Sequence, residues 1–504
     1  MTSEETRSFG SLPLGPQIMV GAFWNTLQLL TARGTSLLVK LVLARLLLPK
    51  DFGIVGMAAI FIDVLGVVTD LGLAAALIQV KKGKASRVHY DTAFWASLGF
   101  SGIILISLIY LVAPFAVLFF GEPTLQTIIP VLGLGTFLQS LGTIHRVLLT
   151  RDLHFKPIGV SEAVSSISAG FVAIALALLG AGVWALVFQD LAYILISLPF
   201  LWRAAKWRPR LQFSRAAFWE IFGVGFSDML LRLITFFTKN VDYLLVGRFL
   251  GAELLGIYTL AFVLTDTFRQ QIWAVFSNVM FPVYSKLQDD VSRVRDYYLK
   301  VIRYNTLIVT AIMLPLIYYS ASFVLTLFGD RWLQAVFPIR ILALSAILVT
   351  MGGTPETVLR GLGRFNVNLR LTLITVFFIA VPAFSLGIYF LGINGAALAV
   401  LTYQTASRIL FQMQMQKLIG VSKSGILGAV KPTLLGVAAT LPVLVVSFFL
   451  SPFSDLGILL LLVVSTELSY GLIVFLVNKT EITDLLRGFS LSIKLSAAKS
   501  KLPT

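Results

Sequence analysis

The sequence predicts an all-α polytopic membrane protein with about 14 transmembrane helices, arranged as two six-helix repeats plus a C-terminal helix pair. Hydrophobic residues make up 57% of the 504 residues and charged residues only 13%, a balance that excludes a soluble globular protein. Most of the chain consists of apolar segments of roughly 20 to 30 residues, each long enough to cross a ~30 Å hydrocarbon layer. Because no long strand-like alternation appears, a helical bundle is favoured over a β-barrel.

The expected spans follow one another with short connections. Outer connections carry Gly or Pro and only a few residues, which leaves no room for an extramembrane domain on that side. We expect membrane spans at 18–47, 52–80, 91–118, 124–148, 158–179, 182–202, 217–250, 253–282, 301–328, 333–359, 368–390, 394–416, 428–450 and 455–477. The outer connections between them are Pro49–Asp51, Gly121–Pro123, Gly180–Gly182, Gly251–Glu253 and Gly329–Trp332.

An internal repeat relates the two halves of the chain. The offset between matching segments grows slowly, as expected for a duplicated unit with small loop insertions. Two like halves in a membrane protein typically move against each other around a shared site, which favours a transport function. The matching segments are Arg45–Ile54 with Arg248–Ile257 (offset 203), Leu108–Gly121 with Leu316–Gly329 (offset 208, seven of fourteen positions identical), and LGAG from Leu179 with LGIN from Leu391 (offset 212).

These observations divide the chain into six parts. We expect a cytoplasmic N-terminal segment (1–16), an N-lobe of helices 1–6 (17–206), a basic cytoplasmic linker (207–216), a C-lobe of helices 7–12 (217–420), helices 13–14 (421–479), and an amphipathic cytoplasmic tail (480–504). The tail carries apolar residues at helical spacing followed by lysines, a pattern typical of a helix lying on a membrane surface.

The basic residues predict the orientation in the membrane. Alternate connections together with the two ends of the chain hold 29 of the 40 Lys and Arg residues, whereas the opposite connections hold two, Lys50 and Arg331. By the positive-inside rule, both termini are expected to be cytoplasmic. The net charge of +16 is therefore a topology signal, and we do not expect a nucleic-acid partner.

The usual sequence signatures of catalysis are missing from this chain. It has no Walker A loop and no cysteine, so nucleotide hydrolysis by that route, disulfides and thiolate chemistry are excluded. A membrane glycosyltransferase or polymerase, a distant alternative, needs an acid/base pair at the outer surface, generally on a substantial loop. The outer connections offer only isolated acids: Asp51, Glu122, Glu253, Asp330 and Asp455. We therefore expect neither an enzyme nor a resident cofactor or metal.

Helix 7 carries the clearest pattern of charges inside a span. Asp228, Arg232, Thr235, Lys239 and Asp242 recur at steps of four, three, four and three, which places them on one helical face. Four charges facing lipid would cost on the order of 10 kcal/mol, so this face is expected to line a wet interior. The alternative is that the acids and bases on this helix only neutralise each other as neighbours.

Helices 1 and 2 carry a second pattern. Arg33 and Lys40 are seven residues apart on helix 1, and Asp63 and Asp70 are seven apart on helix 2. The two bases either form interhelical ion pairs with the two acids or face a ligand. Asp266 aligns with Asp63 at the offset of 203, so the second repeat is expected to present an equivalent carboxylate.

Arg269 lies one turn beyond Asp266, on the same helical face. We predict that Arg33, Lys40, Arg232, Lys239 and Arg269 bind substrate. The acids Asp63, Asp70, Asp228, Asp242 and Asp266 are expected to balance these charges or to bind a coupling ion, H⁺ or Na⁺. Further intramembrane charges are candidates with no supporting spacing: Arg340, Arg408, Glu162, Asp190, Glu356 and Glu467.

Four motifs resemble a known family. They are LARLLLPKDFG at helices 1–2, DLGLAAALIQ from Asp70, VDYLLVGRFLGAELLGIY across helices 7–8, and VMFPVYSKLQDD from Val279. The chain resembles polysaccharide transporters of the multidrug/oligosaccharidyl-lipid/polysaccharide exporter superfamily, and in particular Wzx-type flippases of the exopolysaccharide and colanic-acid-exporter sort. The resemblance runs from about Gln17 to Asn478.

This resemblance implies a multi-pass protein of the bacterial inner membrane with two lobes around a central cavity. Its cargo would be an undecaprenyl-diphosphate-linked oligosaccharide, moved from the cytoplasmic to the periplasmic leaflet, and its partners could include a polysaccharide polymerase and chain-length machinery. Two alternatives from the same superfamily stay open. A cation-coupled multidrug exporter usually carries cationic substrates, which suits bases at mid-membrane poorly, whereas a peptidoglycan-precursor flippase uses the same chemistry with different sugars.

Overall fold

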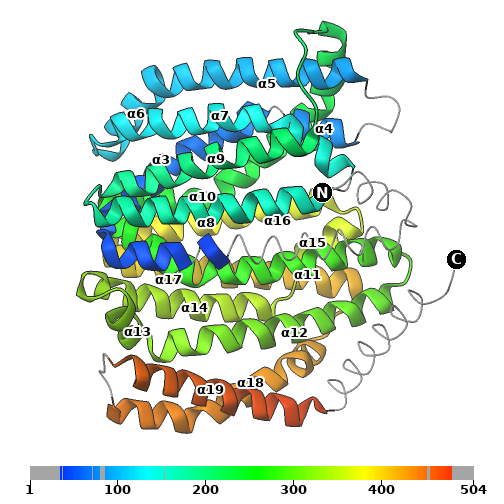
Figure 1. Cartoon of the computed structure of the whole chain (residues 1–504). Coiled ribbons are helices and arrows are strands. Elements are labelled where there is room, and N and C mark those ends of the chain that lie inside the picture. Colours follow the sequence, from blue (N-terminus) through cyan, green and yellow to red (C-terminus); the bar gives the residue numbers. More distant parts are fainter. Residues whose placement is uncertain are drawn as a thin grey trace, which may run out of the picture. The chain divides into compact units, whose positions relative to one another are not determined.

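The computed structural model describes residues 34–36, 38–70, 72–79, 86–152, 154–450 and 455–479. All regular secondary structure in these ranges is helical (Figure 1). Among the described residues, 11 helical segments are long and apolar enough to cross a membrane. The predicted fold class, an all-α polytopic membrane protein, is confirmed.

The chain forms two compact units, Met1–Thr259 and Leu260–Thr504. In the first unit, the helix expected for span 1 is described at residues 34–36 and 38–46. The helices that follow are α3 (Pro49–Asp70), α4 (Leu73–Gln79), α5 (Arg87–Ser107), the π-helical turn η1 (Leu108–Val112), α6 (Ala113–Phe120), α7 (Leu125–Arg151), α8 (Phe155–Leu178), α9 (Val183–Ala205) and most of α10 (Arg215–Leu264).

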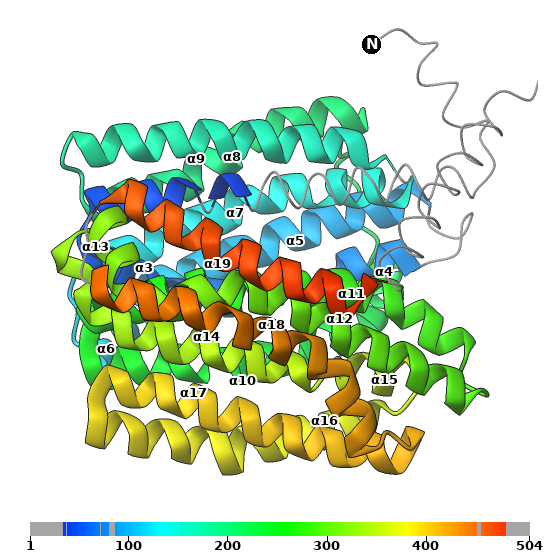
Figure 2. The same cartoon turned by 90° about the horizontal axis from the view of Figure 1, so that it is seen from below.

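The second unit continues the series. It contains α11 (Asp266–Lys286), α12 (Val291–Tyr318), α13 (Ser320–Leu327), the 3₁₀ turn η2 (Asp330–Ala335), α14 (Val336–Met351), α15 (Pro355–Gly361), α16 (Phe365–Thr375), the π-helical turn η3 (Val376–Ala380), α17 (Val381–Ile419), α18 (Lys423–Leu450) and α19 (Leu456–Val477). Figure 2 shows α18 and α19 running side by side, as expected for a final helix pair.

Glycines mark the ends of the predicted spans. Within α10, Gly251 has φ 80° and ψ −178°, and within α17, Gly392 has φ 56° and ψ −132°. Both lie where the sequence predicts a connection between two spans. Gly182 has φ 55° and ψ −130°, the same conformation as Gly392, although these two residues are 210 apart rather than 212 as in the motif alignment. Positive φ favours glycine at each of these turns.

The N-terminal end of α3 and the segment of α10 after Gly251 touch backbone to backbone inside the first unit. A Cβ atom placed on Gly53 would lie 1.6 Å from the carbonyl oxygen of Ala252, and one on Gly256 would lie 1.7 Å from that of Pro49. Small residues allow helices in membranes to approach this closely. Pro49 precedes Ala252 by 203 residues, and Gly53 precedes Gly256 by the same number. Residues that the sequence repeat makes equivalent therefore contact each other in a symmetric way.

The segment between α9 and α10 is bonded along its length to α5. The indole Nε1 of Trp95 donates to the carbonyl of Arg210 over 2.7 Å, and the backbone N–H of Arg210 donates to Asp91 Oδ1 over 3.0 Å. The backbone N–H of Ser214 donates to the Thr92 hydroxyl over 3.0 Å. Asp91 and Thr92 are fully buried. We call residues 206–214 the strap, because these bonds fasten them to α5.

Candidate functional site

In the first unit, three charged side chains are exposed although they lie on helices of the predicted membrane spans. Asp63 belongs to the span Pro49–Thr69 and Asp190 to the span Val183–Ala205, and Lys40 lies in the helix before α3. Lys40 and Asp63 both interact electrostatically with the Asp190 carboxylate. Charges within membrane spans normally face an aqueous cavity or the interior of a bundle. The three residues therefore form a candidate polar site with two carboxylates around one ammonium.

The predicted partners on helices 1 and 2 are only partly visible. Arg33 lies outside the described residues, and so does the side chain of Asp70. The predicted relation between the two helices is therefore described for Lys40 and Asp63 alone, and the structure adds Asp190 of α9 to them. Sequence spacing could not reveal Asp190, because it comes from a helix far along the chain and has no periodic companion. The only signal was an acid inside an apolar span.

On α10, two charged side chains of the predicted stripe, Arg232 and Asp242, are described. Asp242 is buried, and the phenol of Tyr258 donates a hydrogen bond of 2.8 Å to its Oδ2. Arg232 presents an exposed side chain. The side chains of Asp228, Thr235 and Lys239 lie outside the described part of the chain. The binding role of this stripe stays a prediction.

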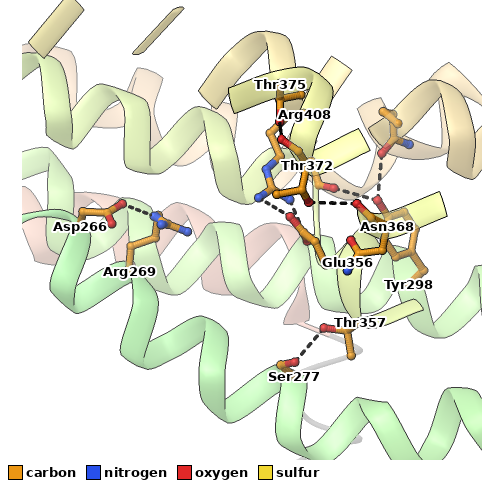
Figure 3. Close-up of polar contacts among 12 residues, drawn as sticks. Asp266, Arg269, Ser277, Tyr298, Glu356, Thr357, Asn368, Thr372, Thr375 and Arg408 are labelled. Carbon is orange, nitrogen blue, oxygen red and sulfur yellow. Dashed lines mark hydrogen bonds and ion pairs between the residues drawn. The ribbon is translucent and has the colours of Figure 1, made fainter. Parts of the chain in front are cut away.

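The predicted pair Asp266 and Arg269 meets on the first turn of α11 (Figure 3). Arg269 Nε donates to Asp266 Oδ1 over 2.7 Å, with only 11% and 5% of the two side chains exposed. The amide of Gln270 donates to the other carboxylate oxygen, Oδ2, over 2.6 Å. The carboxylate therefore has partners on its own helix, and the guanidinium of Arg269 has part of its donor capacity committed to that carboxylate.

A second ion pair in this unit joins α15 to α17. Arg408 holds Glu356 through two bonds, Nη2 to Oε1 at 2.7 Å and Nη1 to Oε2 at 3.0 Å. The aliphatic stem of Arg408 runs over Gly352, where a Cβ atom would lie 2.9 Å from its Cδ. The hydroxyl of Tyr298 lies 2.7 Å from the Gly352 carbonyl oxygen. A bidentate arginine–carboxylate pair fixes both direction and distance between its helices.

Figure 3 shows further polar side chains around this pair. Buried polar atoms are normally bonded to protein or to ordered water, so this cluster is a second polar region in the unit, besides the Asp266–Arg269 pair. Among the described residues, several of its atoms have no protein partner: Arg408 Nε, Gln412 Nε2, Asn368 Oδ1, Thr405 Oγ1 and Thr354 Oγ1. The sequence offered Glu356 and Arg408 only as isolated candidates, because 52 residues separate them.

The other isolated candidates are placed as follows. Glu162 of α8 forms an ion pair with Arg146 of α7. Arg340 Nε donates to the hydroxyl of Ser320 over 2.7 Å. Glu467 lies half-buried in α19. In the described ranges, no three His, Asp or Glu side chains gather as they would around a metal ion.

Comparison with known families decides the class of protein. A family model described as "Polysaccharide biosynthesis protein" matches residues 42–337, more than half of the chain. The chain belongs to this family. The matched residues include Asp63 and Asp190 of the candidate polar site and the whole of α10. Most of the matched residues of this polysaccharide biosynthesis protein therefore lie in the first unit.

Relatives with this kind of name align over long stretches. The chain is 26% identical over 447 residues to the lipopolysaccharide biosynthesis protein WzxC of Escherichia coli, covering 87% of this chain and 88% of that protein. It is 26% identical over 341 residues to the succinoglycan biosynthesis transport protein ExoT of Rhizobium meliloti, covering 68% of each. With the teichuronic acid biosynthesis protein TuaB of Bacillus subtilis it shares 28% identity over 302 residues, 59% of this chain and 62% of TuaB. The alignment thus spans less than two thirds of TuaB's length.

Solved structures share the fold. An inward closed conformation of the lipid II flippase MurJ matches with a TM-score of 0.69 at 13% identity, covering 92% of this chain and 100% of that one. An inward-facing multidrug resistance transporter of the MATE family matches with a TM-score of 0.56 at 18% identity, covering 78% and 96%. These two matches confirm the predicted helical fold, and the family match and the sequence relatives confirm the predicted resemblance to polysaccharide transporters.

Proposed function

We propose that this protein is a flippase that moves an undecaprenyl-diphosphate-linked oligosaccharide from the cytoplasmic to the periplasmic leaflet of a bacterial inner membrane. The product would serve the synthesis of an exopolysaccharide, a capsule or a lipopolysaccharide. The observation that carries the proposal is that two acids inside candidate spans, Asp63 and Asp190, are exposed and that Asp190 interacts with exposed Lys40, in a member of the polysaccharide biosynthesis family.

The chemistry of the cargo matches such a site. A diphosphate joined to several sugars is too polar to cross hydrocarbon unaided. An ammonium such as that of Lys40 attracts the diphosphate through charge-assisted hydrogen bonds, and carboxylates such as Asp63 and Asp190 accept hydrogen bonds from sugar hydroxyls. The bases of α10, Arg232 and Lys239, would extend the cationic surface. Alternating access of the two repeats would then carry the headgroup across while the lipid chain stays in the membrane.

Two other cargos are compatible with the fold. The similarity to a multidrug transporter and to a lipid II flippase comes from structures below 25% identity, so the fold does not choose between cargos. Sequence relatives do favour one class, since WzxC, ExoT and TuaB are all named for polysaccharide biosynthesis. Peptidoglycan precursor is the second candidate, because its lipid diphosphate would meet the same charges.

The experiment that tests this proposal follows the cargo in cells. Deletion of the gene should cause a lipid-linked oligosaccharide to accumulate on the cytoplasmic side and should stop polymer export. Restoring the wild-type gene should reverse both effects, whereas Lys40→Ala at equal protein level should not. Accumulation of lipid II with unchanged polymer export would replace the proposed cargo by the peptidoglycan precursor. Drug sensitivity without any lipid-linked intermediate would favour the multidrug exporter.

Orientation, energy source and partners belong to the same proposal. We infer cytoplasmic termini from the distribution of Lys and Arg. The surplus of carboxylate over ammonium at Lys40, Asp63 and Asp190 leaves room for coupling to H⁺ or Na⁺. A polysaccharide polymerase and its chain-length machinery would take up the product on the periplasmic side.

A further inference from the structure

A groove runs along one face of α16 and the π-helical turn η3 in the second unit. Its volume is about 780 Å³. The lining positions recur every three or four residues, so they form a single helical face. They are Asn366, Leu369, Arg370, Leu373, Ile374, Phe377 and Phe378. Two of these side chains are polar and the others are apolar, which makes the groove amphipathic along its length.

The polar and apolar parts are separated along the helix axis. Asn366 and Arg370 lie in the first two turns of α16, directly after the short connection that carries Arg364, and Arg360 lies in the last turn of α15 before it. By the positive-inside rule this connection is cytoplasmic. Phe377 is seven residues beyond Arg370, about 10 Å deeper at 1.5 Å per residue. The charged end of the groove therefore lies at headgroup depth and the aromatic end among acyl chains.

The opposite face of the same segment is occupied by protein. Thr375 and Val376 are only 2% and 4% exposed, whereas Phe377 and Phe378 are 63% and 76% exposed. The π-helical turn Val376–Ala380 holds an extra residue per turn, and such bulges occur frequently at functional sites. Here two successive phenylalanines project from the exposed side. The groove is thus an open surface that carries two phenylalanines, and the opposite face of its helix is buried against the protein.

We propose that this groove binds the lipid-linked cargo in the cytoplasmic leaflet before translocation. The diphosphate is held by the Arg370 guanidinium and the Asn366 amide, which lie one turn apart. The first isoprene units of the chain follow Leu373, Phe377 and Phe378 into the membrane. This assignment rests on the proposed function and adds a loading site that is separate from Lys40, Asp63 and Asp190.

Charge and shape favour this lipid over an ordinary phospholipid. A guanidinium binds phosphate oxygens in a bidentate manner, and a diphosphate offers more oxygens and more charge than a phosphodiester. A single unbranched track along one helix face suits one long chain, whereas a phospholipid brings two. The sugars of the cargo remain on the cytoplasmic side, where the groove ends beside the basic connection.

Binding to the purified full-length protein in nanodiscs tests this site without requiring transport. The probe is undecaprenyl diphosphate carrying a photoreactive group, competed by unlabelled undecaprenyl diphosphate, undecaprenol or phosphatidylglycerol. We expect crosslinks to map to residues 366–378. Unlabelled undecaprenyl diphosphate should compete at a concentration at least tenfold lower than undecaprenol or phosphatidylglycerol needs. Arg370→Gln should weaken binding about tenfold, Arg370→Lys should restore part of it, and the matched control Arg364→Gln, outside the groove, should leave it unchanged.

Several outcomes overturn the loading site. Equal competition by phosphatidylglycerol would show a general lipid-facing surface. Equal effects of Arg370→Gln and Arg364→Gln would show a diffuse electrostatic attraction. Leu373→Trp, which fills the groove without changing its charge, should also weaken binding. Binding as tight as wild type by this variant would show that the isoprenoid chain of the ligand does not lie in the groove. Because binding is measured directly, these results are distinct from a failure of the flippase proposal, which would appear as unchanged polymer export in the gene deletion.

Discussion

Gly53 and Gly256 occupy equivalent positions in the two repeats, 203 residues apart, and each faces a carbonyl of the other's helix. The Cα–H of Gly53 points toward the Ala252 oxygen, and that of Gly256 toward the Pro49 oxygen. Contacts of this type recur at close helix–helix interfaces and contribute about 0.5–1 kcal/mol each. No side chain fits between these backbones.

Gly53→Ala should therefore separate the two helices. Overpacking of this kind costs about 1–3 kcal/mol, so we expect a lower thermal unfolding temperature of the purified protein and reduced export. Gly66→Ala on the same helix is the matched control, since a Cβ atom there has no neighbour within 4 Å. It should be neutral or slightly stabilising. Equal stability of the two variants would contradict the close contact.

The ion pair between Glu356 and Arg408 should stabilise the second unit mainly against loss of one partner. Arg408→Ala or Glu356→Gln alone is expected to cost about 3 kcal/mol of folding stability. Each change leaves the other, partly buried charged side chain without its ion-pair partner. The double variant Glu356→Gln/Arg408→Met should cost less than the sum of the single changes. Unfolding in a double-mutant cycle measures this coupling, and additive costs would show that the pair contributes no coupling.

Stability should depend on pH through Glu122 in the connection between α6 and α7. Burial opposes ionisation of this carboxyl, but hydrogen bonds from Thr124 and Lys50 and the charge of Lys50 prevail and lower its pKa below the usual 4.5. A lowered folded-state pKa gives stability that is present above the unfolded-state value and is lost as pH falls through the folded-state value.

Wild type should accordingly be more stable than Glu122→Gln at neutral pH, and the difference should shrink as the pH falls below 4.5 toward the lowered folded-state pKa. Thermal unfolding from pH 7 to pH 3 checks this. Lys50→Met is expected to remove part of the same difference. A gap between wild type and Glu122→Gln that stays constant down to pH 3 would rule out this carboxylate as its source.

The predicted topology is testable because the chain has no cysteine of its own. Single cysteines at Gly83 and Glu122 should label from opposite sides of the membrane, the first only after permeabilisation and the second in intact cells. If an impermeant reagent labels both in intact cells, the expected arrangement of fourteen spans is wrong.

The bases of the predicted cavity should be needed for export. Arg232→Ala or Lys40→Ala is expected to abolish export at unchanged protein level, because losing one partner of a desolvated charge pair costs ~2–5 kcal/mol of binding. Lys423→Ala, an exposed lysine at the start of α18, is the control and should export normally.

Exchange of two charges on α10 separates binding from simple neutralisation. Asp228→Arg with Arg232→Asp keeps the net charge but moves the positive charge about one turn, ~5.4 Å. We expect export to fail, because the ligand would meet the wrong charge. Full export by the exchanged variant would mean that these residues only neutralise each other.

Much of the fold was accessible from sequence because its signals are local. Apolar length predicted the spans, and glycine turns such as Gly251 and Gly392 fell where connections were expected. The pair Asp266 and Arg269 was equally accessible, since neighbours on one helical face must lie close. The exact repeat register after α8 was not, because Gly182 and Gly392 share a conformation that the letters LGAG and LGIN do not reveal.

The tertiary polar contacts could not be predicted in this way. Asp190 approaches Lys40 and Asp63 from another helix, and Arg408 meets Glu356 across 52 residues. Nothing in local spacing encodes such distances, and a charge in an apolar span shows only that some partner is needed. The groove on α16 was hidden for a different reason: its register depends on a π-helical turn that the apolar pattern does not mark.

The strap has a consequence for how the protein is made. Its partners Asp91, Thr92 and Trp95 all lie on α5, more than a hundred residues earlier in the chain. These bonds can therefore close as soon as Ser214 has left the ribosome, before any residue of the second unit has been translated. The later helices are then inserted into the bilayer after these bonds in the N-terminal half have formed, and the order of synthesis becomes the order of assembly.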